Sequence, residues 1–88
     1  MSRVRRSIAH RALGRAVRVL RTTRGDSQEA LGFGADIHRN YVGAIERGEL
    51  NPTYTVLLRV ARGLAMPLSE VIALAEEIEQ EVPFSSTS

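Results

Sequence analysis

The sequence has no cysteine, only two histidines, and no apolar run longer than a few residues. Without cysteine, disulfides and cysteine-ligated zinc are excluded, and a reducing compartment suits the chain without being required. A membrane-spanning helix needs about 20 consecutive apolar residues, so we expect a soluble protein. At 88 residues the chain is one small domain that buries only about 60–65% of its unfolded surface. A helix that stays partly apolar after folding should therefore bind a partner.

Each end of the chain lacks charge of one sign. Residues 1–24 hold eight arginines and no acid, whereas the chain from Glu70 onward holds five glutamates and no base. This asymmetry indicates that one end faces a polyanion and the other faces away from it. An arginine-rich start without acids is also typical of an organelle transit peptide. The helical pattern that begins there runs unbroken into the domain, which favours the first interpretation.

Apolar residues recur with a period of 3.6 and show no sustained alternation, which predicts an all-α fold. We expect five helices in one domain over residues 8–82, preceded by a basic N-terminal arm at 1–7 and followed by a loose tail at 83–88. The expected helices span about 8–22, 28–35, 39–47, 54–64 and 67–80.

Local signals support these boundaries. Asp26 or Ser27 can cap the second helix, with Glu29 completing a capping box with Asp26. Gly32 and Gly34 each cost about 1 kcal/mol relative to alanine within a helix, so close approach to a neighbour should compensate.

The third helix has a start and an end of its own. Ile37 and Val42 are spaced as a hydrophobic staple, Gly48 ends the helix, and Thr53 suits the N-cap of the next one. Between them Gly43 and Ala44 leave a bare patch, which we interpret as clearance for a close partner.

The stretch from 13 to 66 contains Ser-Gln-Glu-x-Leu, a tight turn, Tyr-Val-x-x-Ile-Glu-x-Gly, Asn-Pro-Thr and Ala-x-x-Leu in succession. It resembles the Cro/cI-type helix-turn-helix regulators, also called the XRE family, in register and without a gap over about 60% of the chain. The matching residues are Ser27, Gln28, Glu29, Leu31, Arg39, Tyr41, Ile45, Glu46, Arg47, Gly48, Asn51, Pro52, Leu57, Ala61 and Leu64. The resemblance implies a five-helix lambda-repressor-like domain whose third helix enters the major groove.

The N-terminal end of a recognition helix must present hydrogen-bond donors within a groove about 12 Å wide. Arginine can bond O6 and N7 of guanine and asparagine can bond N6 and N7 of adenine, which suits Arg39 and Asn40 to base reading. A phosphate contact or a solvated side chain is the alternative for both. The full set of expected base-reading positions is His38, Arg39, Asn40, Tyr41 and Ala44.

Three of these positions keep a second interpretation. His38 could be a plain helix start, and Tyr41 could be a half-buried core residue or a phosphate ligand. Ala44 stands where the family often has a base-reading side chain, so this protein should rely more on DNA shape there.

Phosphate contacts are expected around the base-reading residues. Gln28 opens the second helix, whose free N–H groups and dipole favour an anion, although an ordinary first-turn glutamine is the alternative. The expected phosphate-contacting residues are Ser27, Gln28, Tyr41, Gly43, Arg47, Asn51 and Thr53. By the same resemblance, Arg21 and Glu46 form a structural ion pair between the first and third helices.

The apolar stripe of the last helix is wider than one core contact requires. We expect the excess to be buried by a second copy, as in the two-fold dimers of the family; closure of the chain's own core is the alternative. The expected interface residues are Leu68, Val71, Ile72, Leu74, Ala75 and Ile78.

Together these features predict a homodimeric, sequence-specific regulator of transcription that binds a pseudo-palindromic DNA operator. The segment HRNYVGAIERGELNP most resembles the small controller proteins of restriction-modification systems, with antitoxin-type autoregulators and prophage repressors as alternatives. RNA polymerase is a further partner to test, and the expected location is the cytoplasm of a prokaryote, at the nucleoid. No cofactor, metal, membrane or small-molecule ligand is expected.

Two other classes of function compete with this one. A protein-interaction module that uses the last helix is the rival, with the helix-turn-helix vestigial. An enzyme is not expected, because the sequence has no cysteine nucleophile, no glycine-rich phosphate loop and no evident acid–base pair.

Overall fold

The computed structural model describes the backbone of residues 2–81 and the side chains of residues 8–81. It contains α1 (Ser2–Arg24), α2 (Gln28–Ala35), α3 (Arg39–Glu46), α4 (Tyr54–Gly63) and α5 (Leu68–Glu81), and the described residues form no strand. The all-α, five-helix prediction is therefore confirmed. The tail expected at residues 83–88 lies outside the described residues.

The first helix is longer than its apolar pattern predicted. It begins at Ser2 rather than near Ile8 and ends at Arg24 rather than near Thr22, so residues 2–7 are its first turns and not a separate arm. The first thirteen residues contain neither glycine nor proline, and arginine is a good helix former. Periodicity underestimated this helix because its first turns carry no regular apolar stripe.

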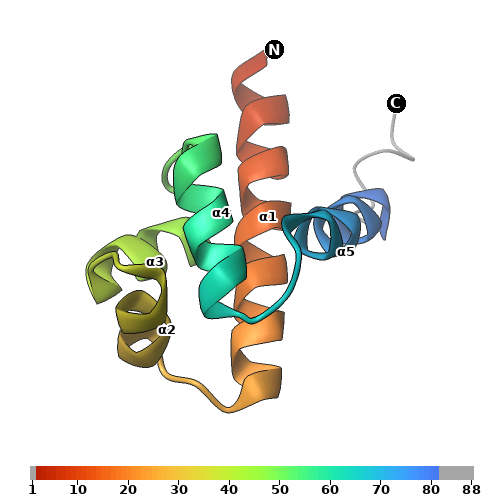
Figure 1. Cartoon of the computed structure of the whole chain (residues 1–88). Coiled ribbons are helices and arrows are strands. Elements are labelled where there is room, and N and C mark those ends of the chain that lie inside the picture. The colour runs from red at the N-terminus through yellow and green to blue at the C-terminus, as the bar shows by residue number, and fades with distance from the viewer. Residues whose placement is uncertain (1, 82–88) are drawn as a thin grey trace.

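The helices are arranged around α1. Figure 1 shows α1 running through the centre, with α2 and α3 on one side, α5 on the other, and α4 in front. Every helix contributes to one apolar core, which is formed by the buried residues Val17, Leu31, Ala35, Val42, Ile45, Val60, Ala61, Leu64 and Val71. This shared core holds α2 and α3 in a defined orientation.

Two glycines allow helices to approach closely around α3. A Cβ at Gly14 would overlap the carbonyl oxygen of Ile45 and lie 2.7 Å from that of Glu46, so the backbone of α1 rests directly on the end of α3. A Cβ at Gly32 would lie 2.6 Å from the Ile37 oxygen, which confirms the expected close approach. At Gly34 it would lie 3.4 Å from Gly63 Cα, an ordinary contact.

Caps define the ends of the short helices. The Ser27 hydroxyl accepts from the Ala30 N–H at 2.9 Å, and the Thr53 hydroxyl accepts from Val56 N–H at 3.2 Å. The capping box of Asp26 with Glu29 is wrong, because Ser27 takes the N-cap position. Asp36 closes α2 in the left-handed conformation, with φ 60°.

Candidate nucleic-acid interface

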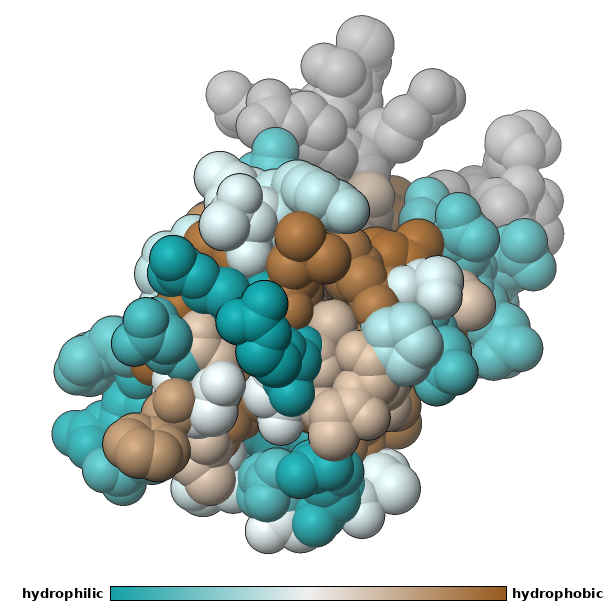
Figure 2. All heavy atoms as spheres, viewed as in Figure 1, coloured by the Kyte–Doolittle hydropathy of each residue, from teal (hydrophilic) through white to brown (hydrophobic). Residues whose placement is uncertain are grey.

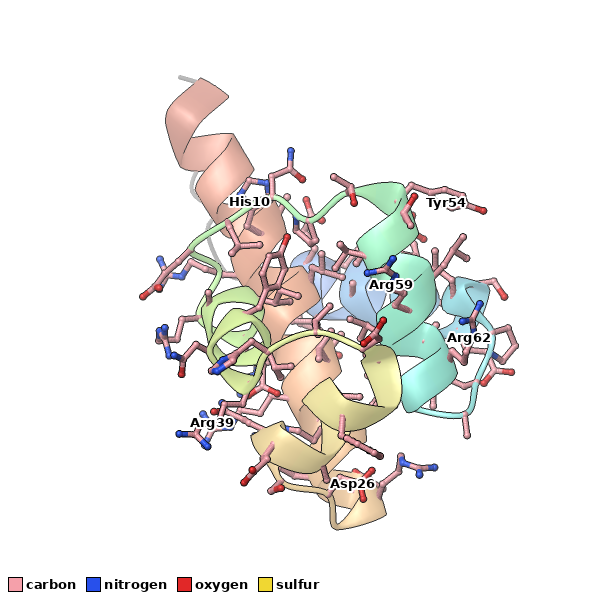
Figure 3. The ribbon with its side chains drawn as sticks, turned by 60° about the vertical axis from the view of Figure 1, so that its left-hand side comes forward. His10, Asp26, Arg39, Tyr54, Arg59 and Arg62 are labelled. Carbon is pink, nitrogen blue, oxygen red and sulfur yellow. The ribbon has the colours of Figure 1, made fainter. Side chains whose placement is uncertain are left out.

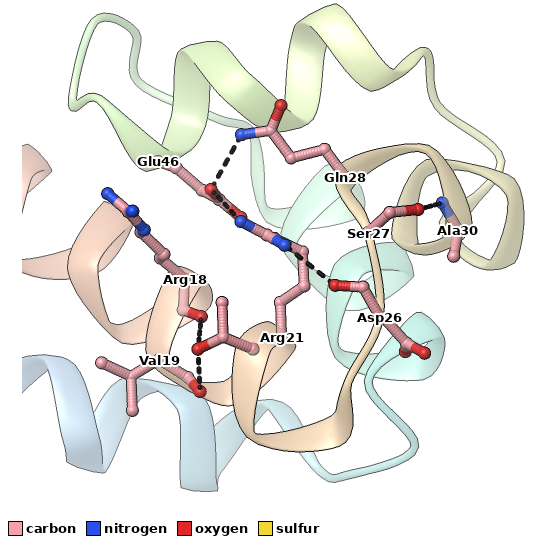
Figure 4. A network of polar contacts seen from close by, with 9 residues as sticks. Arg18, Val19, Arg21, Asp26, Ser27, Gln28, Ala30 and Glu46 are labelled. Carbon is pink, nitrogen blue, oxygen red and sulfur yellow. Dashed lines mark hydrogen bonds and ion pairs between the residues drawn. The ribbon is translucent and has the colours of Figure 1, made fainter.

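The third helix is held to the rest of the molecule by a compact polar network (Figure 4). Arg21 donates to Glu46 twice, from Nε to Oε2 at 2.6 Å and from Nη2 to Oε1 at 3.0 Å. Gln28, the first residue of α2, donates from Nε2 to the same Glu46 Oε1 at 3.0 Å. Arg21 also donates to the Asp26 carbonyl at 2.8 Å. One carboxylate on α3 thus joins α1 and α2.

This network is mostly shielded from water. The side chains of Arg21 and Glu46 keep only 11% and 4% of their accessible surface. The hydrogen bond to Glu46 raises the pKa of Arg21, against the opposing effect of burial. A bidentate arginine–carboxylate pair has a fixed planar geometry, so it sets the orientation of α3 as well as its position. The predicted structural ion pair is confirmed.

Gly43 does not form a bare patch. It is buried, and a Cβ there would lie 3.0 Å from Arg47 Nη1 and 3.4 Å from Gln28 Oε1. The expectation that Gly43 provides clearance for DNA is wrong, because the side chains of Gln28 and Arg47 already cover it. Ala44, one residue on, is half-buried.

His38 caps the start of α3. Its Nδ1 accepts from the Asn40 N–H at 2.9 Å, in place of the serine or threonine oxygen usual at an N-cap. Because Nδ1 accepts this bond, Nε2 is the ring nitrogen left to donate a hydrogen bond. His38 therefore has a structural role at the helix start, while its expected base contact stays a prediction that Nε2 would have to serve.

The expected base-reading residues differ in exposure. Arg39 and Asn40 are exposed at the start of α3, and Arg39 Nη1 lies 3.7 Å from Glu29 Oε2. Figure 3 shows Arg39 projecting from the α2–α3 side, away from Arg62 on α4. Tyr41 is half-buried and packs against the core, so its ring anchors α3.

The expected phosphate ligands surround the end of α3 and the starts of α2 and α4. Arg47 is exposed, and its Nε and Nη2 donate to Glu49 at 2.8 and 3.1 Å. Hydrogen bonding by Arg47 lowers the pKa of Glu49, and the same bonds raise the pKa of Arg47. Asn51, Thr53 and Ser27 are exposed, the last two with their hydroxyls in caps.

The apolar stripe of α5 is divided between the interior and the surface. Val71 and Ala75 keep 0% and 8% of their accessible surface in the chain's own core, so their assignment to a dimer interface is wrong. The remaining expected interface residues are half-buried, namely Leu68, Ile72, Leu74 and Ile78. Figure 2 shows hydrophobic side chains gathered between α4 and α5 on the face drawn there.

Sequence reasoning missed three residues that shape this region. Gly14 places α1 against α3. Glu29 pairs with Arg39 at the start of α3, and Glu49 pairs with Arg47 just after its end. The spacing of Arg47 and Glu49 along the chain was a usable signal for one of these pairs. The packing role of Gly14 had no local signal, because the contact joins distant segments.

Neither a metal centre nor a membrane span is present in the described part of the chain. Residues 8–81 include no group of three or more histidines, aspartates or glutamates placed to hold a metal ion. None of the helices within residues 2–81 has the length and apolar character to cross a membrane.

Comparison with known proteins identifies the family to which the chain belongs. The family model described as a helix-turn-helix domain matches residues 12–74, which include every residue of the α1–α3–α2 network. The chain belongs to the helix-turn-helix family. As a member of that family, of XRE type, it is a DNA-binding regulator rather than an enzyme.

Three similar proteins match most of the chain. The uncharacterized HTH-type transcriptional regulator YgzD of Bacillus subtilis is 36% identical over 61 residues, which are 69% of this chain and 92% of that protein. The control protein C.BamHI of Bacillus amyloliquefaciens is 32% identical over 60 residues, 67% of this chain and 74% of that protein. The crystal structure of the restriction-modification controller protein C.AhdI from Aeromonas hydrophila is 37% identical, with a TM-score of 0.69 over 70% of this chain and 94% of that one.

Proposed function

We propose that this helix-turn-helix protein binds a pseudo-palindromic DNA operator as a homodimer and regulates transcription from it. The observation that carries the proposal is the part-buried Arg21–Glu46–Gln28 network, which joins α1, α2 and α3. A base-reading helix must keep its donors at fixed positions relative to phosphate anchors. This network links the helix that bears Arg39 to the first residue of α2.

Base reading is assigned to the exposed start of α3. Arg39 and Asn40 project there as donors, and each discriminates by about 1–3 kcal/mol when bidentate to its base. His38 adds an Nε2–H donor beside them, because its Nδ1 is occupied by the cap. Tyr41 contributes its hydroxyl at the edge of the core, and Ala44 offers only a methyl group, which suits an apolar contact with thymine.

Phosphate contacts are assigned to the rim of this surface. Gln28 and Ser27 stand at the N-terminus of α2, where helix N–H groups favour an anion. Arg47 and the Asn51–Thr53 loop supply the opposite side, and Gly43 leaves room for the Gln28 and Arg47 side chains that lie over it. These contacts fix the position and orientation of the protein on the duplex, and they carry no sequence information of their own.

Dimerisation is assigned to the part of α5 that the core leaves uncovered. Leu68, Ile72, Leu74 and Ile78 are half-buried within one chain, so a second copy would cover their remaining apolar surface. A two-fold dimer places two recognition helices about 34 Å apart in successive major grooves. The operator is therefore expected to contain two inverted half-sites one helical turn apart.

The regulatory context proposed is that of a restriction-modification controller. Its support is the identity of 32% to C.BamHI and 37% to C.AhdI, both controller proteins by name. Such a protein acts at the nucleoid in the cytoplasm of a prokaryote, and contact with RNA polymerase stays a prediction. Footprinting the DNA upstream of its own gene, and identifying the genes beside it, separates this role from that of an antitoxin-type autoregulator.

The function is tested by replacing a base-reading and a phosphate-contacting arginine on the same operator. Arg39→Ala should weaken operator binding by about 1–3 kcal/mol and relax the preference at one base pair per half-site. Arg47→Ala should weaken all sequences alike. Fluorescence anisotropy with the footprinted operator and with each single-base variant measures both effects.

The two arginines are similarly exposed, with 59% of each side chain accessible, so each variant controls for the other. Unchanged base preference in Arg39→Ala would contradict the base-reading assignment. A protein that binds no duplex even at low salt would favour the rival role as a protein-interaction module.

A further inference from the structure

An open groove lies over α1, flanked by the end of α3 on one side and by α5 on the other. Its basic wall is formed by Arg11, Arg15 and Arg18 of α1, together with Arg47 at the end of α3. The groove lies next to the candidate DNA surface, because the side chain of Arg47 also covers Gly43 and Arg11 contacts Gly48. Figure 4 shows the Arg18 side chain extending from α1 toward the end of α3.

The three arginines of α1 lie on one face of the helix. Their spacing of four and three residues repeats the helical turn, so they form a row along α1. The row is about 10 Å long at 1.5 Å per residue, the length of about three base-pair steps of B-DNA. All three side chains are exposed.

The charge in this groove is largely uncompensated within the described part of the chain. Across residues 8–81 the arginines paired with a carboxylate are Arg21, Arg24, Arg39 and Arg47, and the α1 row is not among them. Glu46 lines the groove but is bound by Arg21 and Gln28. Glu81 lies on the α5 side of the groove. The row therefore faces solvent as a line of positive charge.

We infer that Arg11, Arg15 and Arg18 form a second phosphate-binding track, which continues the DNA contact from Arg47 along α1. The inference rests on the proposed function, since it needs the recognition helix on DNA. Two observations favour DNA as the occupant: the charge of the wall and its continuity with Arg47, which belongs to both surfaces. The track reads no bases and adds salt-sensitive affinity for any sequence.

The test compares two double substitutions that remove the same charge from different faces. Arg15→Gln with Arg18→Gln alters the track, and Arg59→Gln with Arg62→Gln alters α4. Both pairs are exposed helical arginines three residues apart, and glutamine matches arginine in helix propensity. Figure 3 shows Arg59 and Arg62 on α4, away from Arg39.

The measurement is binding to a fluorescent 30-base-pair duplex of mixed sequence between 50 and 250 mM NaCl. Removing one arginine–phosphate interaction should reduce the slope of log affinity against log salt by about 0.9. For the α1 pair we therefore expect the slope to fall by about 1.8 per protomer, and for the α4 pair by far less. Circular dichroism and light scattering check that both variants keep the fold and the oligomeric state.

Each alternative result has a distinct meaning. Equal slopes for the two variants, with DNA binding by the unsubstituted protein intact, would overturn the track and leave the proposed function standing. Weakened self-association with an unchanged slope would mean that the groove receives a second copy, which also overturns the track. No binding by the unsubstituted protein at 50 mM NaCl would overturn the proposed function and the track together.

Discussion

Two arginines expected to meet DNA are held by carboxylates of their own chain. Arg39 lies 3.7 Å from Glu29, and Arg47 lies 2.8 Å from Glu49. All four side chains are more than half exposed, so these pairs add little to folding stability. We expect a larger effect on binding, because a DNA group that binds either arginine must displace the carboxylate that already faces its guanidinium. The acids would thereby restrain binding to arbitrary DNA.

Removing one of these carboxylates should strengthen DNA binding. In Glu49→Gln the guanidinium of Arg47 is free to meet phosphate, and a nearby negative charge is removed. We expect affinity for a mixed-sequence duplex to rise several-fold, with a salt slope steeper by up to about 0.9 per protomer. Anisotropy titrations at several salt concentrations measure both.

The matched control is Glu77→Gln, which removes an exposed glutamate from α5. The hydrogen bond from Arg47 lowers the pKa of Glu49 below its ordinary 4.5. The carboxylate is therefore ionised at pH 5 as at pH 7, and the difference between the two variants should persist at pH 5. Equal gains from Glu49→Gln and Glu77→Gln would indicate a general charge effect and not a local restraint.

At the level of elements, the position of α3 depends on backbone contact as well as side-chain pairing. Gly14 brings α1 against the last carbonyls of α3, about two helical turns before Arg21 and its pair with Glu46. The recognition helix is only eight residues long, too short to be stable alone. Its start is closed by the local His38 cap, and its end is held by the contact with α1.

A methyl group at this contact should separate the two helices. Gly14→Ala would place its Cβ 2.7 Å from the Glu46 oxygen, and backbone cannot move aside as a flexible side chain can. We expect a loss of about 1–3 kcal/mol in the free energy of unfolding, measured by urea denaturation. Specific DNA binding should fall as well, because α3 is displaced.

A second helical glycine should have the opposite effect on the free energy of unfolding when it is replaced by alanine. Gly34 is exposed, and its Cβ would make only an ordinary contact. Gly34→Ala should therefore stabilise the protein by about 0.5–1 kcal/mol through helix propensity. If Gly34→Ala destabilised the protein as Gly14→Ala does, α2 would tolerate no added bulk and the expected contrast between Gly14 and Gly34 would be wrong.

At the scale of the whole molecule, basic and acidic side chains are separated. Arg11, Arg15 and Arg18 of α1 lie beside the candidate DNA surface, whereas α5 carries all five glutamates that follow Pro67. We expect a dimer formed through α5 to keep most of these acids away from DNA, with Glu81 at the edge of the α1 groove, and to present two basic surfaces on one side. Repulsion between DNA and the acidic end would then help to orient the bound protein.

This arrangement predicts a dimer in solution. Light scattering at micromolar concentration should give about twice the 9.7 kDa of one chain. Ile72→Glu and Leu74→Glu each place a charge on one half-buried flank of α5, and at least one should yield a folded monomer with weakened operator binding. A stable monomer of the unsubstituted protein, with and without DNA, would contradict the dimer.

Much of the helix-turn-helix could be predicted from the sequence because its signals are local. Helix periodicity, the caps at Ser27 and Thr53 and the termination at Gly48 all operate within a few residues. The Arg21–Glu46 pair was also predicted, although its partners are 25 residues apart. That prediction depended on a family resemblance, because spacing alone does not determine which side chains meet.

The sequence by itself determined the five helices, the approximate limits of α2 to α5 and the residues that stand at the start of α3. Only the tertiary structure decided which surfaces remained available: Gly43 is covered by Gln28 and Arg47, and Val71 lies inside the chain's own core. The same packing decided that Arg47 and the α1 row share one groove. The physical reason is that helix formation follows local hydrogen bonding and periodicity, whereas exposure depends on how closely separate helix backbones approach.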